Sequence, residues 1–134
     1  MRVLGIDCGT EFTGFGVCED DDAGRLRYLT CGVIQLSKRD SLPVRLASIY
    51  ESLIALLETH HPDVVSIEEV FYSVNAKSAL KLGQVRGVAM LAAASAKLPV
   101  AEYSPLAIKS SVTGYGHADK QQVQQMVTNL LRLD

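Results

Sequence analysis

The stretch GIDCGTEFTGFGV, residues 5–17, places a single acidic residue, Asp7, at the end of an apolar run. Residues 2–8 are nearly all apolar, which is typical of a strand buried on both faces. Glycines at positions 9, 14 and 16 indicate that the chain folds straight back beside this strand. The stretch has two interpretations. Either Asp7 holds a metal ion for phosphate chemistry, or the Gly-Thr turn binds the phosphates of a nucleotide.

The segments that follow predict an antiparallel meander and then a helix. Residues 13–19 and 25–36 have the pattern of two more strands, separated by the acidic turn DDDAG, so residues 2–36 form three consecutive strands. The hydrophobic period then becomes that of a helix that begins at Ser41 and ends before Pro62. Its apolar face carries Leu42, Leu46, Ile49, Leu53 and Leu56.

Strands and helices alternate in the remainder of the chain. We expect strands at 63–67 and 99–103, and helices at 75–97, 104–112 and 119–133. The residues of the last helix that we expect to face inward are Val123, Met126, Val127, Leu130 and Leu131. A meander followed by strands that are reached through helices predicts an α/β fold. Its sheet would be mixed and five-stranded, with two parallel strands and helices on its faces.

Composition and length indicate one globular domain. The chain has 134 residues, of which 48% are hydrophobic, enough for a sizeable core. Its longest apolar run inside a predicted helix, Val88 to Ala94, is too short to span a bilayer, and no signal peptide precedes the first strand. Three widely spaced cysteines, at positions 8, 18 and 31, predict reduced, buried thiols on strands of a cytoplasmic protein.

Charge divides the chain into two unlike halves. Residues 1–74 carry six basic and twelve acidic residues, a net charge of −6, whereas residues 75–134 carry seven basic and three acidic residues, a net charge of +4. An acidic half joined to a basic half suits metal-assisted chemistry on a polyanion, although chance asymmetry of a solvated surface gives the same count.

A second acidic strand end lies in PDVVSIEEVFYSVNAKSALKLGQVRG, residues 62–87. Here a short buried strand ends in Glu68 and Glu69. Two strand ends that deliver carboxylates to one place repel each other unless a cation lies between them, because burial and like charge both disfavour ionisation. Mg²⁺ takes oxygen ligands and leaves positions open for water and phosphate. Taken singly, either acid is as well explained as a helix cap or an ion-pair partner.

Three stretches together resemble the RuvC-type Holliday junction resolvases: GIDCGTEFTGFGV, IEEVFYSVNAKSALKLGQVRGV and EYSPLAIKSSVTGYGHADKQQVQQMV. The resemblance runs from residue 2 to residue 133, with the motifs in the order and at the spacing of the family. It implies an RNase H-like fold and a homodimer that makes Mg²⁺-dependent paired nicks in four-way DNA junctions, with Mn²⁺ as a substitute ion. It also implies recombination and repair as the process, and the RuvA–RuvB branch-migration complex as a partner.

The resemblance assigns roles to individual residues. Asp7 matches the metal-binding aspartate of the first strand, and Glu68 matches the second catalytic acid, whereas Glu69 falls where the family often has an uncharged polar residue. Cys8 replaces the proline that usually follows the first aspartate. Phe71 matches an aromatic residue that stacks on unpaired bases at the junction.

Basic residues of the second half are implied to contact DNA. Lys109 and Lys120 match lysines near the scissile phosphate, where they neutralise charge or support the transition state. Lys77 and Lys81 share a helix face at i,i+4, and with Arg86 they are expected to contact the DNA backbone, although each suits a solvated helix face equally well.

The family completes its site with two aspartates, three residues apart, on a helix beyond the LLxL motif. The sequence ends at Asp134, directly after LLRL, so we interpret it as a single domain, residues 1–134, truncated before that helix. It then supplies two of the four expected carboxylates, and a fragment that binds junctions without cutting them is one alternative.

Two further alternatives remain open at this point. GIDCGT also resembles the phosphate-binding turn of sugar-kinase and heat-shock-type ATPases, which need a second lobe that 134 residues cannot hold. A related RNase H-like nuclease that processes ribosomal RNA precursors shares the first acidic strand but lacks the NAxSALKLGQ run. The resemblance therefore favours the metal interpretation of Asp7.

Overall fold

The structure, a computed structural model, describes residues 1–69 and 75–133, which form five strands and four helices. The predicted order of elements is confirmed, and the ends of the elements differ from the predicted ones by at most two residues. The strands are β1 (Arg2–Asp7), β2 (Phe12–Asp20), β3 (Leu26–Gln35), β4 (Val64–Glu68) and β5 (Val100–Tyr103). The helices are α1 (Leu42–His60), α2 (Ala76–Ser95), α3 (Pro105–Thr113) and α4 (Lys120–Leu131).

The five strands form one mixed sheet in the order β3-β2-β1-β4-β5. β1, β2 and β3 pair antiparallel as the expected meander, while β1 pairs parallel with β4 and β4 pairs parallel with β5. β1 is therefore central, and its carboxyl end points the same way as the carboxyl ends of β4 and β5. The predicted α/β fold class is confirmed.

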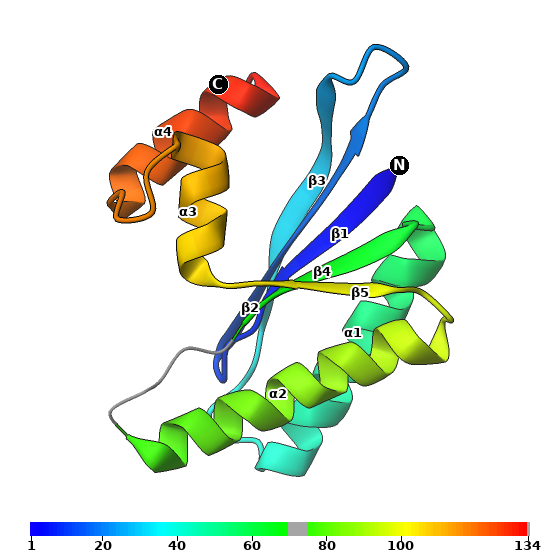
Figure 1. Cartoon of the computed structure of the whole chain (residues 1–134). Helices are drawn as coiled ribbons and strands as arrows, with labels where there is room; N and C mark the ends of the chain where they lie inside the picture. The colour runs from blue at the N-terminus through cyan, green and yellow to red at the C-terminus, as the bar shows by residue number, and fades with distance from the viewer. Residues whose placement is uncertain (70–74, 134) are drawn as a thin grey trace.

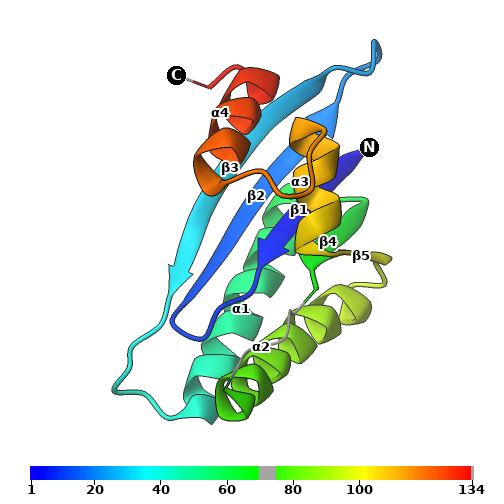
Figure 2. The ribbon, with the colours of Figure 1, turned by 60° about the vertical axis from the view of Figure 1, so that its left-hand side comes forward.

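Helices α1 and α2 cover one face of the sheet, and α3 and α4 lie over the other (Figures 1 and 2). α1 begins after Ser41, which occupies the predicted N-cap position without a side-chain cap hydrogen bond. α2 begins after Asn75, whose side chain accepts hydrogen bonds from the backbone N–H groups of Lys77 and Ser78. Caps of this kind satisfy backbone donors that have no partner inside the helix.

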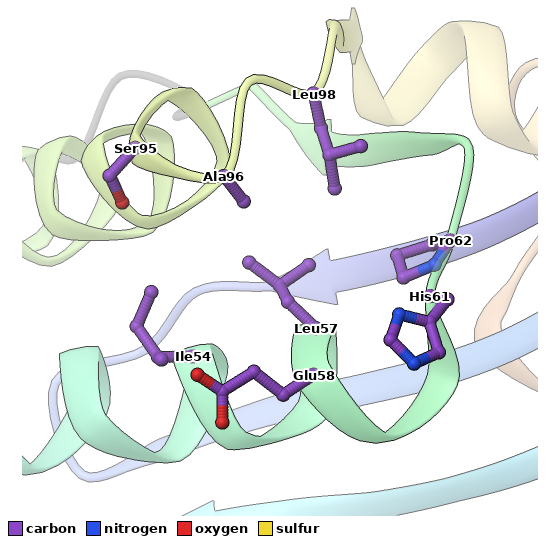
Figure 3. Close-up of a pocket in the computed structure, with 8 residues that line it drawn as sticks. All are labelled: Ile54, Leu57, Glu58, His61, Pro62, Ser95, Ala96 and Leu98. Carbon is purple, nitrogen blue, oxygen red and sulfur yellow. The ribbon is translucent and has the colours of Figure 1, made fainter.

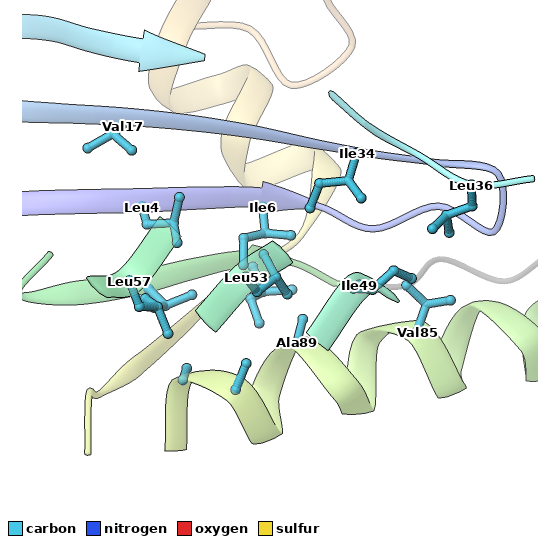
Figure 4. Packing of buried hydrophobic residues seen from close by; sticks show 14 residues of the cluster. Leu4, Ile6, Val17, Ile34, Leu36, Ile49, Leu53, Leu57, Val85 and Ala89 are labelled. Carbon is cyan, nitrogen blue, oxygen red and sulfur yellow. The ribbon is translucent and has the colours of Figure 1, made fainter. Parts of the chain in front are cut away.

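The hydrophobic core lies between the sheet and the layer of α1 and α2 (Figure 4). α1 contributes Ile49, Leu53 and Leu57, so the last fully buried position is Leu57, and the predicted Leu56 is only partly buried. α2 contributes Val85 and three alanines, whose small side chains bring this helix close to its neighbours. The strands contribute Leu4, Ile6, Val17, Ile34, Val65 and Ile67.

The other face of the sheet is much more open than the sequence predicted. In β1 only Leu4 and Ile6 are buried, so the strand is buried on one face rather than on both. Neither α3 nor α4 contains a buried residue. Of the α4 residues expected to face inward, Met126 and Leu130 are exposed and the others are only partly buried. The amphipathic pattern located the helix correctly but overestimated its burial, because periodicity does not report how closely a face is covered.

The cysteines are free, as predicted, but not uniformly buried. Cys8 and Cys18 are partly buried, whereas Cys31 is exposed on β3. Burial raises the pKa of the Cys8 thiol to about 11, with the neighbouring Asp7 charge acting in the same direction. None of the helices in the described part of the chain is both long enough and apolar enough to cross a membrane.

Candidate active site

The carboxyl ends of β1 and β4 bring the two predicted acids together. Ile6 pairs with Ile67 in the parallel ladder, and the next residues along the two strands are Asp7 and Glu68. The isoleucine side chains are buried in the core. Because side chains alternate across a strand, both carboxyl groups project from the opposite face, which carries α3 and α4. Asp7 is exposed and Glu68 is half-buried.

A tight turn fixes the backbone immediately after Asp7. The Thr13 side chain is fully buried, and its Oγ1 both donates to the Gly9 carbonyl at 3.2 Å and accepts from the Gly9 N–H at 3.3 Å. A Cβ atom on Gly9 would lie 2.1 Å from the Phe12 carbonyl oxygen, so only glycine fits. The Arg45 guanidinium of α1 donates to the Thr10 carbonyl at 3.3 Å. The turn is therefore tied to both the hairpin and the helix layer.

Gly14 keeps space open beside the first acid. It is the partner of Asp7 in the β1–β2 ladder, so a side chain at this position would project from the same face as the carboxylate. A Cβ added to Gly14 would lie 3.9 Å from the Asp7 Cβ. Any longer side chain would stand beside the carboxylate and compete with a ligand for that space.

The two carboxyl groups interact electrostatically. The pKa of Glu68 is raised, first by burial, then by the negative charge of Asp7 and by a hydrogen bond with it, and the charge of Lys109 opposes this shift. Burial is the largest cause, and the charge of Asp7 adds to it, so the ionised pair is partly uncompensated. A cation that binds between Asp7 and Glu68 would relieve this repulsion.

The chemistry of this donor set fits a hard divalent cation. Among the described residues no group of three or more His, Cys, Asp or Glu side chains is placed to hold a metal, so the described site offers two carboxylates. Mg²⁺ is commonly held by one or two carboxylates, with water and substrate phosphates filling its other positions. Asp7 and Glu68 meet that requirement.

The predicted lysines occupy different positions relative to the acids. Lys109, on α3, is partly buried, and its charge acts on Glu68, so the structure brings it to the site. Lys120 is exposed at the first position of α4, where the Asp119 capping box begins the helix. Lys77 is exposed and Lys81 half-buried in the first two turns of α2. No described interaction connects these three lysines to the acids.

Of the two other residues that the resemblance places at the DNA, the structure describes Arg86. The Arg86 side chain is 20% exposed, and its Nη2 lies 2.7 Å from Oε2 of Glu102 on β5, so its guanidinium is engaged by an ion pair inside the protein. Phe71 lies outside the described residues. Sequence reasoning missed Glu102 and the buried Thr13. The signal for Glu102 was a lone acid in the apolar strand VAEY. The signal for Thr13 was a threonine four residues after Gly9.

A pocket of about 420 Å³ lies at the other end of the parallel strands (Figure 3). Its lining comes from the last turns of α1 and α2 and from the residues that precede β4 and β5, including Leu57, Pro62 and Leu98. The acids are at the carboxyl ends of these strands, so this pocket is separate from the site. Its walls are mostly apolar, and Glu58 and His61 are the titratable side chains that line it.

The strand order and the two acids at adjacent strand ends define an RNase H-like protein with an acidic site on its open face. The family model described as Crossover junction endodeoxyribonuclease RuvC matches residues 3–134, and the chain belongs to this family.

Proteins and structures similar to this chain carry the same description. The protein named crossover junction endodeoxyribonuclease RuvC from Koribacter versatilis is 59% identical over 133 residues, which cover 99% of this chain and 80% of the relative. The protein of the same name from Acidobacterium capsulatum is 57% identical, and the match covers 99% of this chain and 81% of that protein. The structure of Thermus thermophilus RuvC in complex with a Holliday junction substrate superimposes with a TM-score of 0.94 at 33% identity, with 100% and 81% covered.

Proposed function

We propose that this chain is a structure-specific endonuclease that resolves four-way Holliday junctions by paired, symmetric nicking during DNA recombination and repair. The observation that carries the proposal is the juxtaposition of Asp7 and Glu68 at adjacent parallel strand ends, on the open face of the sheet. Membership of the RuvC family supports the choice of junction DNA as the substrate.

Asp7 and Glu68 would hold Mg²⁺, or Mn²⁺ in its place. When bound, such an ion supplies an activated water and neutralises charge on the phosphodiester. The residues of the chain have separate tasks. The two carboxylates fix the position of the ligand, because a rigid sheet carries both of them. Lys109, whose charge already reaches Glu68, neutralises the scissile phosphate.

The basic half of the chain would bind the junction backbone. Lys120 and Lys77 each place a side chain in the first turn of a helix, where phosphate is also favoured by the helix dipole, and Lys81 follows in the second turn of α2. Phe71 is proposed, from the family resemblance alone, to stack on unpaired bases. If these lysines contact phosphates, the affinity for junctions falls steeply with salt.

The test is nicking of a synthetic four-way junction in Mg²⁺. The unaltered protein is expected to nick two opposed strands, and Asp7→Asn is expected to bind the junction but not to nick it. Glu69→Gln is the matched control, because Glu69 is the neighbouring acid, is exposed, and is not assigned to the site. Junction affinity of the unaltered protein without any nicking would favour the binding-only alternative. Preference for RNA over junction DNA would favour the RNA-processing alternative.

We also propose a homodimer formed through the outward face of α2. Buried Ala89, Ala92 and Ala93 of α2 pack within the chain, so these alanines are not available to a partner. The exposed face instead carries a continuous stripe of small and apolar residues at helical spacing: Leu80, Gly83, Gly87, Leu91 and Ala94. A two-fold dimer would place two active sites on the two symmetry-related strands of a junction.

The dimer is tested by sedimentation at micromolar concentration. A Cβ on Gly87 would meet nothing within 4 Å, so Gly87→Leu fits the folded chain and improves helix propensity. It is expected to shift the protein to monomer. Ala55→Leu, which enlarges an exposed position of α1, is the control and is expected to leave the dimer intact. An unaltered protein that stays monomeric yet nicks both strands would contradict the dimer.

A cytoplasmic location and engagement of the RuvA–RuvB complex complete the proposal. The free cysteines and a DNA substrate support the first. Family membership supports the second.

A further inference from the structure

One ion pair fastens the helix layer to the edge of the sheet. Arg86 lies near the middle of α2, and its Nη2 lies 2.7 Å from Oε2 of Glu102 on β5. Their side chains are 20% and 37% exposed. The other ion pairs among the described residues involve the N-terminus, the β2–β3 hairpin or loop residues, so in this part of the chain only this pair joins a helix to a strand.

Glu102 is directly beside the strand that carries the second acid. It is the ladder partner of Ile67, the residue before Glu68. One residue later the backbone N–H of Glu69 donates to the Tyr103 carbonyl at 2.8 Å, so β5 holds the β4 chain on both sides of Glu68. Any shift of β5 is therefore transmitted to the backbone of Glu68.

The Arg86–Glu102 ion pair lies on the packed face of the sheet. Ile67 and Glu102 share the face of the sheet that packs on α1 and α2, whereas Asp7 and Glu68 project from the other face. Arg86 thus lies behind the strand ends that carry the acids, on the side away from their carboxyl groups.

We propose that Arg86 and Glu102 act as a pair of positioning residues, which fix the carboxyl ends of β5 and β4 against α2 and so set the position of Glu68 relative to Asp7. The inference rests on the proposed nuclease function. It replaces the role in DNA-backbone contact that the sequence suggested for Arg86. The physical basis is that the Arg86 guanidinium, at 20% exposure, is costly without its partner and relaxes toward solvent. Small displacements at a catalytic site are expensive in rate.

The experiment compares Arg86→Gln, Glu102→Gln and the double variant in the full-length protein. Single-turnover nicking is measured at saturating junction. The dissociation constant of the junction is measured across a salt series without divalent ions, and melting temperature reports folding. Arg25→Gln is the matched control, because it breaks an exposed ion pair with Asp21 in the hairpin. Arg86→Lys keeps a cation at the position but loses the planar fork of the guanidinium.

Each single variant is expected to slow nicking about tenfold or more, with the dissociation constant within about twofold of the unaltered protein and an unchanged salt slope. The double variant is expected to be no slower than the slower single variant, because the pair acts as a unit. Arg86→Lys is expected to recover part of the rate, and Arg25→Gln to retain all of it. If Arg86→Gln does not fold, Glu102→Gln, which removes the more exposed partner, carries the same expectation.

Three results would overturn the inference. Weaker junction binding by Arg86→Gln, with a salt slope reduced by about one, would identify a direct phosphate contact. Multiplicative losses in the double variant would show that the two residues act independently. Normal rates in both single variants would remove the positioning role while leaving the nuclease proposal intact. If the unaltered protein does not nick junctions at all, both proposals fail together.

Discussion

The two faces of the sheet have opposite properties. The face toward α1 and α2 carries the buried strand residues, including Leu4 and Ile6, and meets fully buried side chains such as Leu53. The face toward α3 and α4 carries Asp7 and Glu68, and neither of these two helices contains a buried residue. The packed face supplies most of the free energy of unfolding, and the proposed chemistry lies on the open face, although the same strands form both faces.

A strand with a side-chain period of two makes this division possible. In β1 Leu4 and Ile6 enter the core, whereas the alternating residues Gly5 and Asp7 face the open side. The packed face holds the backbone rigid, so the acids on the other face need no packing of their own to keep their positions. They stay close to solvent, which suits the proposed binding of a hydrated cation and a phosphate.

The largest expected effect is the loss of nicking when Glu68, on the open face, is replaced. Glu68→Gln keeps the size of the side chain but removes a charge from the open face, so nicking in Mg²⁺ should fall at least about 10³-fold. The free energy of unfolding should stay the same or rise, because the repulsion by Asp7 is removed. Nicking rates and urea denaturation of the same preparation measure both quantities. If Glu68→Gln lost nicking only because it unfolds, stability and nicking would not depend on different faces of the sheet.

A change on the packed face should have the reverse signature. Leu53→Ala removes a side chain that is 1% exposed, which should lower the free energy of unfolding by about 2–5 kcal/mol. Val33→Ala is the control, because Val33 lies on β3 and is 61% exposed, and its change should stay within about 0.5 kcal/mol. Denaturant midpoints are the measurement. Equal losses from the two variants would show that the second face is covered as tightly as the first.

Gly9→Ala tests the turn after Asp7, which joins β1 to β2 and is hydrogen-bonded to the helix layer. The added Cβ would lie 2.1 Å from the Phe12 carbonyl oxygen, so the turn after Asp7 must open. We expect a loss of about 1–3 kcal/mol in the free energy of unfolding, together with loss of nicking, since the Asp7 backbone moves. Gly5→Ala is the control in the same strand, where the new Cβ makes only an ordinary 3.8 Å contact with the Gly16 carbonyl oxygen. Normal nicking by Gly9→Ala would show that the turn does not position the acid.

The sequence was sufficient to predict the order of elements along the chain, a meander followed by two parallel strands, and the meeting of Asp7 with Glu68. Both inferences depend on local patterns, since each acid follows an apolar strand and parallel strands align their carboxyl ends. The family resemblance placed Lys109 near the scissile phosphate, and the structure shows that its charge acts on Glu68.

Features that depend on tertiary contacts could not be predicted in this way. The partner of Arg86 lies sixteen positions away in another element, and no periodicity connects a helix residue to a strand residue at that distance. The burial of α4 was overestimated because its apolar residues, such as Leu130, form a correct helical face that nothing in the described chain covers closely. Phe71 lies outside the described residues, so its role stays a prediction.

The smallest expected effect concerns pH and the open face alone. The pKa of Glu68 is raised in the folded protein, above the ordinary value of 4.5, so the folded state favours the protonated form. Its contribution to stability is fully present at low pH and is lost as the pH rises from about that ordinary value through the raised pKa. In the absence of divalent ions, the unaltered protein should therefore lose stability relative to Glu68→Gln over this range. The difference should stay below about 1 kcal/mol, because solvent screens a half-buried carboxyl.

Asp7→Asn provides the sharper control for this pH effect, because the Asp7 charge is one of the causes of the shift. With Asp7→Asn present, the pH-dependent difference in stability between the chain with Glu68 and the chain with Glu68→Gln should shrink. The difference that remains reports the burial of Glu68 alone. Glu69→Gln, at the exposed neighbouring acid, should follow the unaltered protein. Urea midpoints between pH 4 and pH 8, with and without Mg²⁺, measure the effect, and added Mg²⁺ should reverse its sign, since the ion binds the ionised pair. The opposite result would be an unaltered protein that gains stability relative to Glu68→Gln as pH rises without metal. It would mean that the charge of Glu68 is already compensated, so the open face holds no unbalanced pair of carboxylates.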